Sequence, residues 1–509
     1  MLRRMMRATW RGTSLSWRRC ASAAKLAALG ALLGAMAQPL YALPGVKVMA
    51  IPAFARKYGL PCSACHTAWP ELNNFGQVFR DNGYQLMNDR DSPIWQNPSY
   101  FPITLRMTPN WHLENTTNQP VDSTAVTAVP CTAGSTTTCV SRTVQVNGFD
   151  LSGMDFWTAG TLYKNVSFSL LPSSDSTATF HFENAFVRFD NLAHTSWLNF
   201  RFGRFELDNL ISEKRFLFLS ANGGLYQNYH FAPAGDTNDF GIGDNQLGVE
   251  LAGHSANSYT RYSVSVLSNN EGSVNFGAGA PSLPNVNAGR TYDAFFAFSQ
   301  TFNLGNQGYE RIGAYAYTGW RPTYTLTSNG AQIFGEGRGN KPFYRAGVAA
   351  DLFFLNSKLE FLPFYLHGYD NVYLGIGAPA NESLSMACPT TATMVVTCRG
   401  PQWNGGFLET HYYYSPQLVF VGRYELIRMQ QQAFSNSPGN LSNIDAYSIG
   451  YRWYPIMFSR AGLAFHNEYS ITKSIGIVPL SLDGVGLAPL AANGKVWSSS
   501  LFIGFDFDF

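Results

Sequence analysis

Residues 501–509 read LFIGFDFDF, and this stretch decides the class of fold. Large apolar residues alternate in it with small or acidic ones: Leu501, Ile503, Phe505, Phe507 and Phe509 against Gly504, Asp506 and Asp508. A period of two is that of a β-strand, whose successive side chains point to opposite faces. A strand with one apolar and one polar face suits the wall of a transmembrane β-barrel, which has lipid outside and a wet lumen inside.

The same period recurs along the chain, for example over residues 198–202, 443–454 and 463–471. An even number of strands is typical of single-chain bacterial barrels, and we count about sixteen here. We therefore predict an all-β fold for residues 101–509, an antiparallel transmembrane β-barrel. Counted back from the end of the chain, its strands are predicted at 494–509, 461–473, 443–455, 417–429, 404–414, 357–370, 342–354, 308–322, 288–304, 258–270, 243–254, 196–207, 176–190, 155–171, 141–150 and 102–114.

The connections between these strands alternate in length. Barrels of this kind have short periplasmic turns and long outer loops, so both chain ends are expected on the periplasmic side. The longest internal connection, 208–242, fits either a constriction folded into the lumen or a plain surface loop. The short links are 305–307, 355–356, 415–416 and 456–460, and the long ones are 271–287, 323–341, 371–403 and 474–493.

The composition supports a membrane barrel. Charged residues make up only 13% of the chain and aromatic residues 15%, whereas an ordinary soluble domain carries about 25% charged residues. After residue 42, the sequence lacks the ~20 consecutive apolar residues that a membrane-spanning helix needs. The net charge of +2 and the scattered Lys and Arg residues give no reason to expect nucleic-acid binding.

Residues 1–42 have the features of a secretory signal peptide. A basic region that includes Arg3, Arg4 and Lys25 precedes a short apolar core at 26–37, and cleavage is expected after Ala42. We therefore expect the mature protein to be exported and to reside in the bacterial outer membrane, in contact with its lipid.

Seven cysteines are present, and Cys20 lies within the predicted signal peptide. The other six form three local pairs. An even number of cysteines in an oxidising compartment indicates disulfides for pairs that have no other role. We predict the disulfides Cys131–Cys139 and Cys388–Cys398, each on an outer loop.

The third pair belongs to the motif Cys62-Ser63-Ala64-Cys65-His66. C-x-x-C-H is the pattern for covalent c-type haem attachment, with two thiols spaced for the two vinyl groups and an imidazole for the iron. The alternatives are a disulfide or redox dithiol and half of a zinc site. A thioredoxin-like site would need a βαβ context, and a zinc site would need a second Cys/His pair; the sequence has neither. We predict one haem c, bound covalently by Cys62 and Cys65, with His66 as the proximal iron ligand.

The haem motif lies in a small N-terminal segment, residues 43–100. A helix is predicted from Trp69 to Gly83, with Pro70 at its first position and an apolar stripe of Leu72, Phe75 and Phe79. That stripe fits packing on a porphyrin and packing on the barrel wall equally well. A segment of this size cannot bury enough surface alone. We therefore expect a helical monohaem cytochrome c segment that plugs the periplasmic mouth or the lumen of the barrel.

The distal iron ligand is left open by the sequence. Met87 lies just beyond the predicted helix and is the candidate thioether ligand. His112 would instead give a bis-histidine iron, and Met107 lies on the first predicted strand. A methionine is more often a packing residue than a ligand.

The segment resembles a known family over about residues 50–86. Its FARKYG at 54–59, the haem motif, PELN at 70–73, FG at 75–76 and GY at 83–84 are similar to the fused monohaem cytochrome-porins of iron-oxidising bacteria. The resemblance implies an oxidoreductase that takes electrons from extracellular ferrous iron and passes them to a periplasmic electron carrier. By motif matching it also implies covalent haem attachment for Cys62 and Cys65 and iron ligation for His66.

Two other functions remain open. The barrel could be a diffusion porin in which the haem segment is a plug or a sensor, or a scaffold on which a separate periplasmic cytochrome docks. Carboxylates expected in the lumen, such as Glu183 and Glu468, do not by themselves make an iron site, because oxygen ligands are common in a wet lumen. The sequence leaves the oligomeric state open.

Overall fold

The computed structural model describes most of the residues that follow the predicted signal peptide, and all of those described belong to one compact unit, Met49–Phe509. The signal peptide and Cys131, Cys388 and Cys398 lie outside the described residues, as does the side chain of Cys139, so both disulfides stay predictions. The described residues are 53–68, 71–88, 91, 93, 102–122, 139–174, 180–207, 210, 245–268, 292–305, 308–321, 324–326, 332–334, 341–369, 402–429, 444–457, 462–475 and 495–508.

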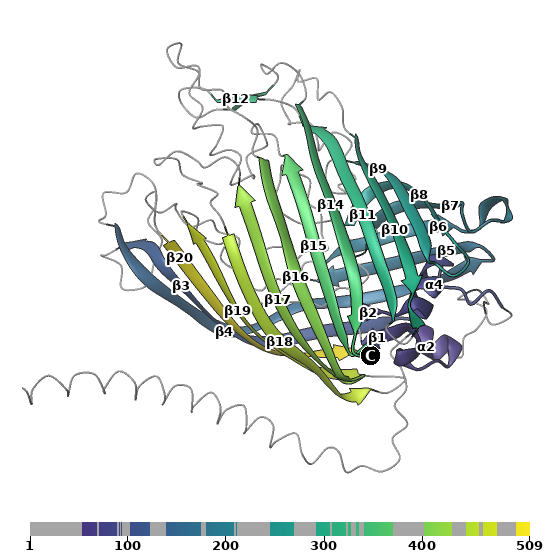
Figure 1. The fold of residues 1–509 in the computed structure, drawn as a ribbon, viewed down its shortest axis with the longest axis horizontal. Coiled ribbons are helices and arrows are strands. Elements are labelled where there is room, and N and C mark those ends of the chain that lie inside the picture. Colours follow the sequence, from purple (N-terminus) through teal and green to yellow (C-terminus); the bar gives the residue numbers. More distant parts are fainter. Residues whose placement is uncertain are drawn as a thin grey trace, which may run out of the picture. The chain divides into compact units, whose positions relative to one another are not determined.

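Sixteen of the described strands form a closed antiparallel barrel (Figure 1). The last strand closes the barrel on the first, with Leu501 opposite Leu113. The predicted sixteen-stranded β-barrel is therefore confirmed. Its strands are β3 (Thr104–Asp122), β4 (Cys139–Tyr163), β5 (Val166–Ser174), β6 (Phe180–Phe189), β7 (Asn199–Glu206), β8 (Asn245–His254), β9 (Thr260–Ser268), β10 (Tyr292–Asn303), β11 (Tyr309–Arg321), β14 (Lys341–Phe354), β15 (Leu359–Tyr369), β16 (Gln402–Ser415), β17 (Leu418–Met429), β18 (Ile444–Met457), β19 (Gly462–Ile475) and β20 (Lys495–Asp508).

The outer face of the wall is apolar, as β20 shows. Ile503 and Phe505 are each 40% exposed, whereas Phe502 is 2% and Asp506 is 0% exposed. The exposed positions are those that the alternation assigned to lipid, so the wall has the surface of a transmembrane barrel. No helix within the described ranges is long and apolar enough to cross a bilayer.

The prediction of two separate strands at 141–150 and 155–171 is wrong, because β4 runs unbroken to Tyr163. Between Leu151 and Met154 the chain forms a β-bulge rather than a turn, since two residues of β4 there face a single residue of β3. A glycine within a strand marks a bulge as readily as it marks a turn, and Gly153 is one of the two.

The turn from β4 to β5 is made by Lys164 and Asn165. Asn165 has a φ of 60°, a left-handed conformation that asparagine tolerates better than most residues. The number of strands is unaffected, because the predicted segment 155–171 had joined the end of β4 to the start of β5. A short hairpin between β11 and β14, β12 (Tyr324–Leu326) with β13 (Gln332–Phe334), was not predicted.

The inner face is less polar than the alternation predicts. One group of inward side chains forms an apolar cluster, which also includes Leu210, only 4% exposed, from the start of the connection 208–242. Leu210 lies against Gly313 of β11, so this connection turns inward at its start. The cluster consists of Phe186, Phe205, Leu207, Leu210, Leu267, Phe295, Tyr315, Tyr317, Ala349, Leu362, Phe364, Leu366 and Phe407.

The N-terminal segment contains short elements: α2 (Ala53–Tyr58), α3 (Cys62–Cys65), β1 (His66–Ala68), β2 (Glu71–Leu72) and α4 (Asn74–Asp81). The helix predicted from 69 to 83 is therefore too long at both ends. β2 pairs with β1, with Leu72 opposite His66, so the chain stays extended until Asn73. The Asn73 side chain then caps α4 by accepting from the Gly76 amide.

The end of α4 agrees better with the prediction. Gly83 takes a φ of 69°, and its amide donates to Arg80 while the Tyr84 amide donates to Phe79. These two bonds form a Schellman motif, for which glycine is the favoured residue. The predicted stripe is only partly buried, because Phe79 is 7% exposed but Phe75 is 44% exposed.

The lipid-facing role of the outer side chains can be tested on β10. Phe298, near its middle, is 52% exposed, and Phe302, near the short turn, is 47% exposed. We expect Phe298→Arg to lower the free energy of unfolding by about 2–4 kcal/mol, because it places a charge near the bilayer centre. Phe302→Arg, the matched control, is expected to cost about 0–1 kcal/mol because it lies near the interface. Denaturant unfolding in lipid vesicles measures both, and equal costs would contradict the assignment.

Candidate functional site

The two cysteines of the haem motif lie on one short helix, α3, in the thiol form. Their spacing of three residues brings both side chains to the same side of a helical turn. Cys62 is 8% exposed, and Cys65 is partly buried. The helix ends directly before His66, which is extended. Two thiols and an imidazole therefore come from one tight stretch of backbone.

The orientation of His66 is fixed by a backbone hydrogen bond. Its Nδ1 lies 3.2 Å from the carbonyl oxygen of Glu71. A carbonyl oxygen can only accept, so Nδ1 is the donor of this bond, and in the neutral ring the lone pair is then on Nε2. A histidine that binds a metal usually donates its other N–H to a carbonyl or carboxylate in this way. His66 thus has the tautomer that a haem ligand requires.

Asn73 fastens the haem motif to α4. Its Nδ2 donates to the carbonyl oxygens of Ser63, at 3.2 Å, and Ala64, at 3.1 Å. Its own amide donates to the Cys65 carbonyl at 2.9 Å. One side chain therefore satisfies carbonyls at the end of α3 while it also caps α4. No role was predicted for Asn73, although an asparagine ahead of an apolar stripe is a helix N-cap signal.

Gly76 allows α4 to pack directly on the motif. A Cβ atom at this position would lie 2.1 Å from the carbonyl oxygen of Cys65. That contact is too short for any side chain, so glycine is required here for close approach of two backbones.

Burial raises the pKa of the Cys65 thiol to about 11, and the neighbouring Cys62 adds to the effect. A thiol held in its neutral form is a poor nucleophile in the absence of an activating group. This is the environment of a protected thiol rather than of a redox-active dithiol, whose thiolate is stabilised.

The residues of the motif meet the requirements of a c-type haem. They provide two thiols on one helical face, an adjacent imidazole with its lone pair on Nε2, and an apolar side chain, Phe75, exposed on the neighbouring helix. The donor set therefore fits covalent attachment through Cys62 and Cys65 and ligation by His66.

The three candidates for the distal ligand lie in different places. Met87 is in the loop after α4, with a φ of 59° and a side chain that is 52% exposed. Asp91 holds this loop by accepting from the amides of Leu86 and Asn88. His112 and Met107 both lie on β3. Met107 faces Phe507 of β20 on the lipid side, because directly paired residues of neighbouring strands share a face. Met107 is therefore a poor candidate for the distal ligand, because its side chain faces lipid.

Aromatic side chains hold the two helices of the segment together. Phe79 packs edge-on against Phe54 and Tyr58, with ring centroids 5.1 Å and 5.4 Å apart. The Tyr58 hydroxyl lies 3.0 Å from both the Tyr84 carbonyl and Asp91. Burial lowers the pKa of Lys57, an effect that Asp91 partly offsets. The segment therefore has a small core of its own, built from residues before and after the motif.

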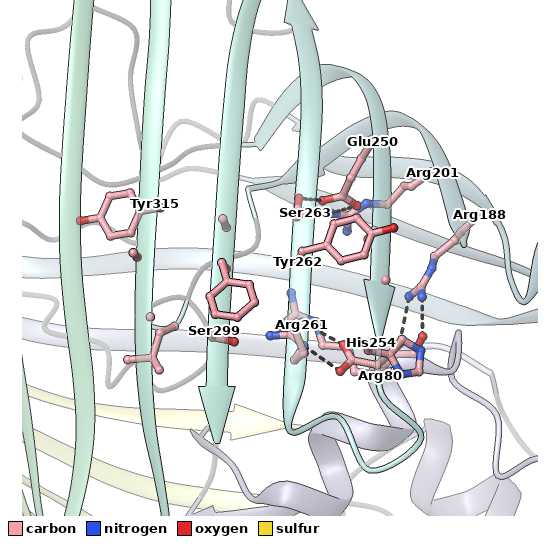
Figure 2. A pocket seen from close by; sticks show the side chains of 18 of the residues that line it. Arg80, Arg188, Arg201, Glu250, His254, Arg261, Tyr262, Ser263, Ser299 and Tyr315 are labelled. Carbon is pink, nitrogen blue, oxygen red and sulfur yellow. Dashed lines mark hydrogen bonds and ion pairs between the residues drawn. The ribbon is translucent and has the colours of Figure 1, made fainter. Parts of the chain in front are cut away.

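Two arginines of the barrel wall contact the C-terminal end of α4 (Figure 2). Arg261 on β9 makes a two-pronged contact with Asp81, at 2.8 Å and 2.9 Å. Arg188 on β6 donates to the carbonyl oxygens of Arg80, at 3.2 Å, and Asp81. Cationic side chains at a helix C-terminus satisfy its last carbonyls and oppose its dipole favourably. These contacts border a cavity that Arg201 and Glu250 also line.

Other inward residues contact the segment on further strands. Ala55 and Cys62 pack with Tyr454 of β18 and Ala464 of β19. Ala68 packs with β14, β16 and β17, next to Phe353, Tyr413, Val419 and Val421. Just before β3, the Ile103 carbonyl accepts a hydrogen bond from Arg56 at 2.8 Å. The ring of Phe54 packs edge-on against Trp157 of β4. The segment thus contacts the inner wall from many directions, near the short turns.

Glu71 joins the haem motif to the wall most directly. Its carbonyl accepts from His66, and its side chain, 0% exposed, contacts Tyr413 and lies 3.3 Å from His411 on β16. No role was predicted for Glu71, because the partners of its side chain lie more than 300 positions away in the sequence.

Comparison with known proteins adds only a likeness of fold. No protein-family model matches the chain, and the comparison with curated proteins gave no match. Among solved structures, it is similar to the outer membrane channel DcaP of Acinetobacter baumannii at 11% identity, over 79% of this chain and 96% of that one, with a TM-score of 0.41. An anion-selective porin from Comamonas acidovorans matches at 11% identity over 80% and 99%, with a TM-score of 0.45. OprB of Pseudomonas putida matches at 9% identity over 79% and 94%, with a TM-score of 0.42.

The close approach at Gly76 gives a first test. Gly76→Ala should separate α4 from α3 and cost about 1–3 kcal/mol locally, because the added methyl overpacks the contact. We expect trypsin to cut faster at Lys57 and Arg80, while the barrel keeps its folded mobility on unheated gels. Gly422→Ala, on a barrel strand with open space around the new methyl, is the matched control. If Gly76→Ala is cut no faster than wild type, α4 does not depend on this close contact with Cys65.

The thiol environment gives a second test, on protein matured without haem. With a pKa of about 11, about one Cys65 in a thousand is a thiolate at pH 8 (11 − 8 = 3 units). The rate of alkylation by iodoacetamide should therefore rise about tenfold per pH unit up to pH 10. Peptide mass spectrometry measures this rate, and the urea-unfolded chain is the control. A rate that levels off below pH 9 in the folded protein would contradict the burial of Cys65.

Proposed function

We propose that this protein is a bacterial outer-membrane cytochrome that transfers electrons from an extracellular donor to a periplasmic electron carrier. The observation that carries the proposal is the His66 Nδ1 hydrogen bond to the Glu71 carbonyl within a C-x-x-C-H motif. It gives the imidazole the tautomer and orientation of a haem ligand. A bound haem c would supply one-electron redox chemistry.

The chain's own residues supply the binding site. Cys62 and Cys65 would hold the haem by thioether bonds, and His66 would be the proximal ligand. Asn73 and Gly76 keep these three residues in place against α4. Met87 is proposed as the distal ligand: its loop is anchored by Asp91, and its thioether is exposed.

We propose further that residues 43–100 form a haem domain that plugs the barrel at its periplasmic end. Support comes from the contacts of residues 53–88 with inward side chains on β4, β6, β9, β14, β16, β17, β18 and β19. These side chains lie close to the short turns, which in barrels of this kind are periplasmic. The haem would then lie on the side of the periplasmic carrier, within a wall that reaches the outer surface.

Ferrous iron is the proposed extracellular donor. This part of the proposal rests on the resemblance of residues 50–86 to the fused monohaem cytochrome-porins. One electron would leave each ferrous ion, which becomes ferric, and would end on the periplasmic carrier. The protein would then be an iron:cytochrome c oxidoreductase that oxidises iron without importing it.

Haem staining and stopped-flow spectroscopy test the proposal together. We expect haem to stay with the wild-type chain through denaturing electrophoresis and to be lost when Cys62 and Cys65 are both changed to Ala. Ferrous iron should reduce the haem of wild-type protein at the pH of the organism's growth. His367→Ala, which removes a partly buried histidine at the end of β15 away from the short turn, is the control and should keep both properties. A chain without covalent haem would overturn the cytochrome proposal, and a haem that ferrous iron does not reduce would overturn the iron proposal alone.

The second candidate is a diffusion porin with a haem-bearing plug or sensor segment. The observation in its favour is the sixteen-stranded barrel, since barrels of 16 to 18 strands can leave an aqueous channel. A vesicle-swelling assay tests the porin function: vesicles that contain the purified protein are placed in sugars of increasing size, and the swelling rate is measured. Swelling that equals that of a general porin would favour this function, whereas swelling only after removal of residues 43–100 would favour the plug.

A further inference from the structure

A buried cluster of ligand-type side chains lies where β2 meets the barrel wall. Oxygen atoms of Glu71 and Glu360 and a ring nitrogen of His411 all lie within 4.8 Å of one another. All three side chains are 0% exposed. Glu71 comes from the N-terminal segment, Glu360 from β15 and His411 from β16. We propose that this cluster is a binding site for one divalent first-row transition metal ion, which fastens the N-terminal segment to the barrel.

The three ligand atoms lie close enough together to bind one ion. Nδ1 of His411 lies 2.7 Å from Glu360 Oε2 and 3.3 Å from Glu71 Oε2. In a tetrahedral site with metal–ligand distances of about 2.0–2.2 Å, ligand atoms are about 3.4 Å apart. Small side-chain movements therefore bring these atoms into a coordination sphere. The Tyr413 hydroxyl contacts both carboxylates and is placed to be the fourth ligand.

The surroundings of His411 are those of a metal-bound histidine. Its other ring nitrogen, Nε2, lies 2.6 Å from Glu409 Oε1. A ligating histidine typically donates its second N–H to a carboxylate, which orients the ring and raises its basicity. Glu409 is held in turn near Arg423, whose Nε lies 3.4 Å away. This outer arrangement leaves Nδ1 to face the two glutamates.

One buried acceptor of the cluster, on Glu360, has no hydrogen-bond donor among the described residues. Tyr413 has a single hydroxyl proton for the two carboxylates that it contacts. Oε1 of Glu360 is buried and, within the described residues, lacks a hydrogen-bond partner. A buried carboxylate oxygen without a partner is costly unless a cation or a proton neutralises it. A metal ion would satisfy this oxygen and balance the charges of two glutamates.

The ligand types define the class of metal. Carboxylate, imidazole and phenol oxygen or nitrogen atoms suit Zn²⁺, Fe²⁺ and Mn²⁺, whereas thiolates would be expected for Cu⁺. Four protein ligands in a closed, buried site are typical of a structural ion rather than a catalytic one. This site is distinct from the proposed haem site, although Glu71 contributes to both: its side chain to the metal and its carbonyl to His66.

Metal analysis of the purified full-length protein tests the proposal. The chain is folded in detergent, loaded with Zn²⁺ alone or with Fe²⁺ alone without oxygen, and desalted before elemental analysis. We expect one tightly bound ion per chain in addition to the haem iron. Glu360→Gln and His411→Ala should each weaken binding by more than the outer-sphere variant Glu409→Gln, for which we expect about a 10–100-fold loss. His466→Ala, which removes another buried inward histidine beside a glutamate, is the matched control and should bind as wild type does.

Folding and haem content are checked on the same samples. Mobility on unheated gels reports the folded barrel, and Glu360→Gln keeps the shape of the side chain in case His411→Ala does not fold. Wild-type protein without bound metal, or folded Glu360→Gln with unchanged affinity, would overturn the proposal and leave a proton-sharing cluster as the explanation. Haem staining is read separately, so failure of the metal site is distinguished from failure of the proposed cytochrome function.

Discussion

The barrel turns charged side chains inward, away from both lipid and bulk water, and each such charge needs a partner. Arg201 pairs with Glu250 at 2.6 Å, and Arg452 pairs with Asp506. Removing one member of a buried pair leaves an uncompensated charge, a loss of about 3–5 kcal/mol. The same requirement explains the contact between the N-terminal segment and the wall, because Arg261 of the wall is paired with Asp81 of the segment.

The N-terminal segment depends on its contacts with the wall because it is too small to be stable alone. Its own core is a few aromatic rings around Phe79, and other side chains of the segment, such as Ala55 and Ala68, pack on the barrel. The geometry of the haem motif follows from this arrangement. His66 is oriented by the Glu71 carbonyl, and Glu71 is in turn fixed by its buried side chain against β16. The wall therefore sets the position of a residue of the motif through a single connecting residue.

Much of the fold could be predicted from the sequence, because lipid imposes a strict alternation. Outward positions such as Phe505 must be apolar, and this period identifies strands without any knowledge of their partners. The errors occurred where one residue type serves two purposes. Gly153 fits a bulge as well as a turn, and Pro70 fits a helix start although Asn73 is the actual cap. The side chains that face the lumen obey no such rule, so the apolar cluster around Phe295 was not foreseen.

The candidate site also contains residues that could be predicted from the sequence and residues that could not. Cys62, Cys65 and His66 are adjacent in sequence, and their spacing alone indicates the chemistry. Glu360 and His411 become neighbours of Glu71 only through closure of the barrel, so no local pattern could have joined them. Glutamate and histidine are ordinary residue types for a lumen. These three differ from the others because they are fully buried in contact with one another.

A double-mutant cycle on Asp81 and Arg261 tests whether the wall holds the N-terminal segment through buried ion pairs. Asp81→Asn, Arg261→Gln and the double variant are compared with wild type by the free energy of segment release, measured by native-state hydrogen exchange of α4. We expect a coupling energy of about 1–3 kcal/mol between the two residues. Additive effects, with a coupling energy near zero, would contradict this expectation and show that the segment is held by other means.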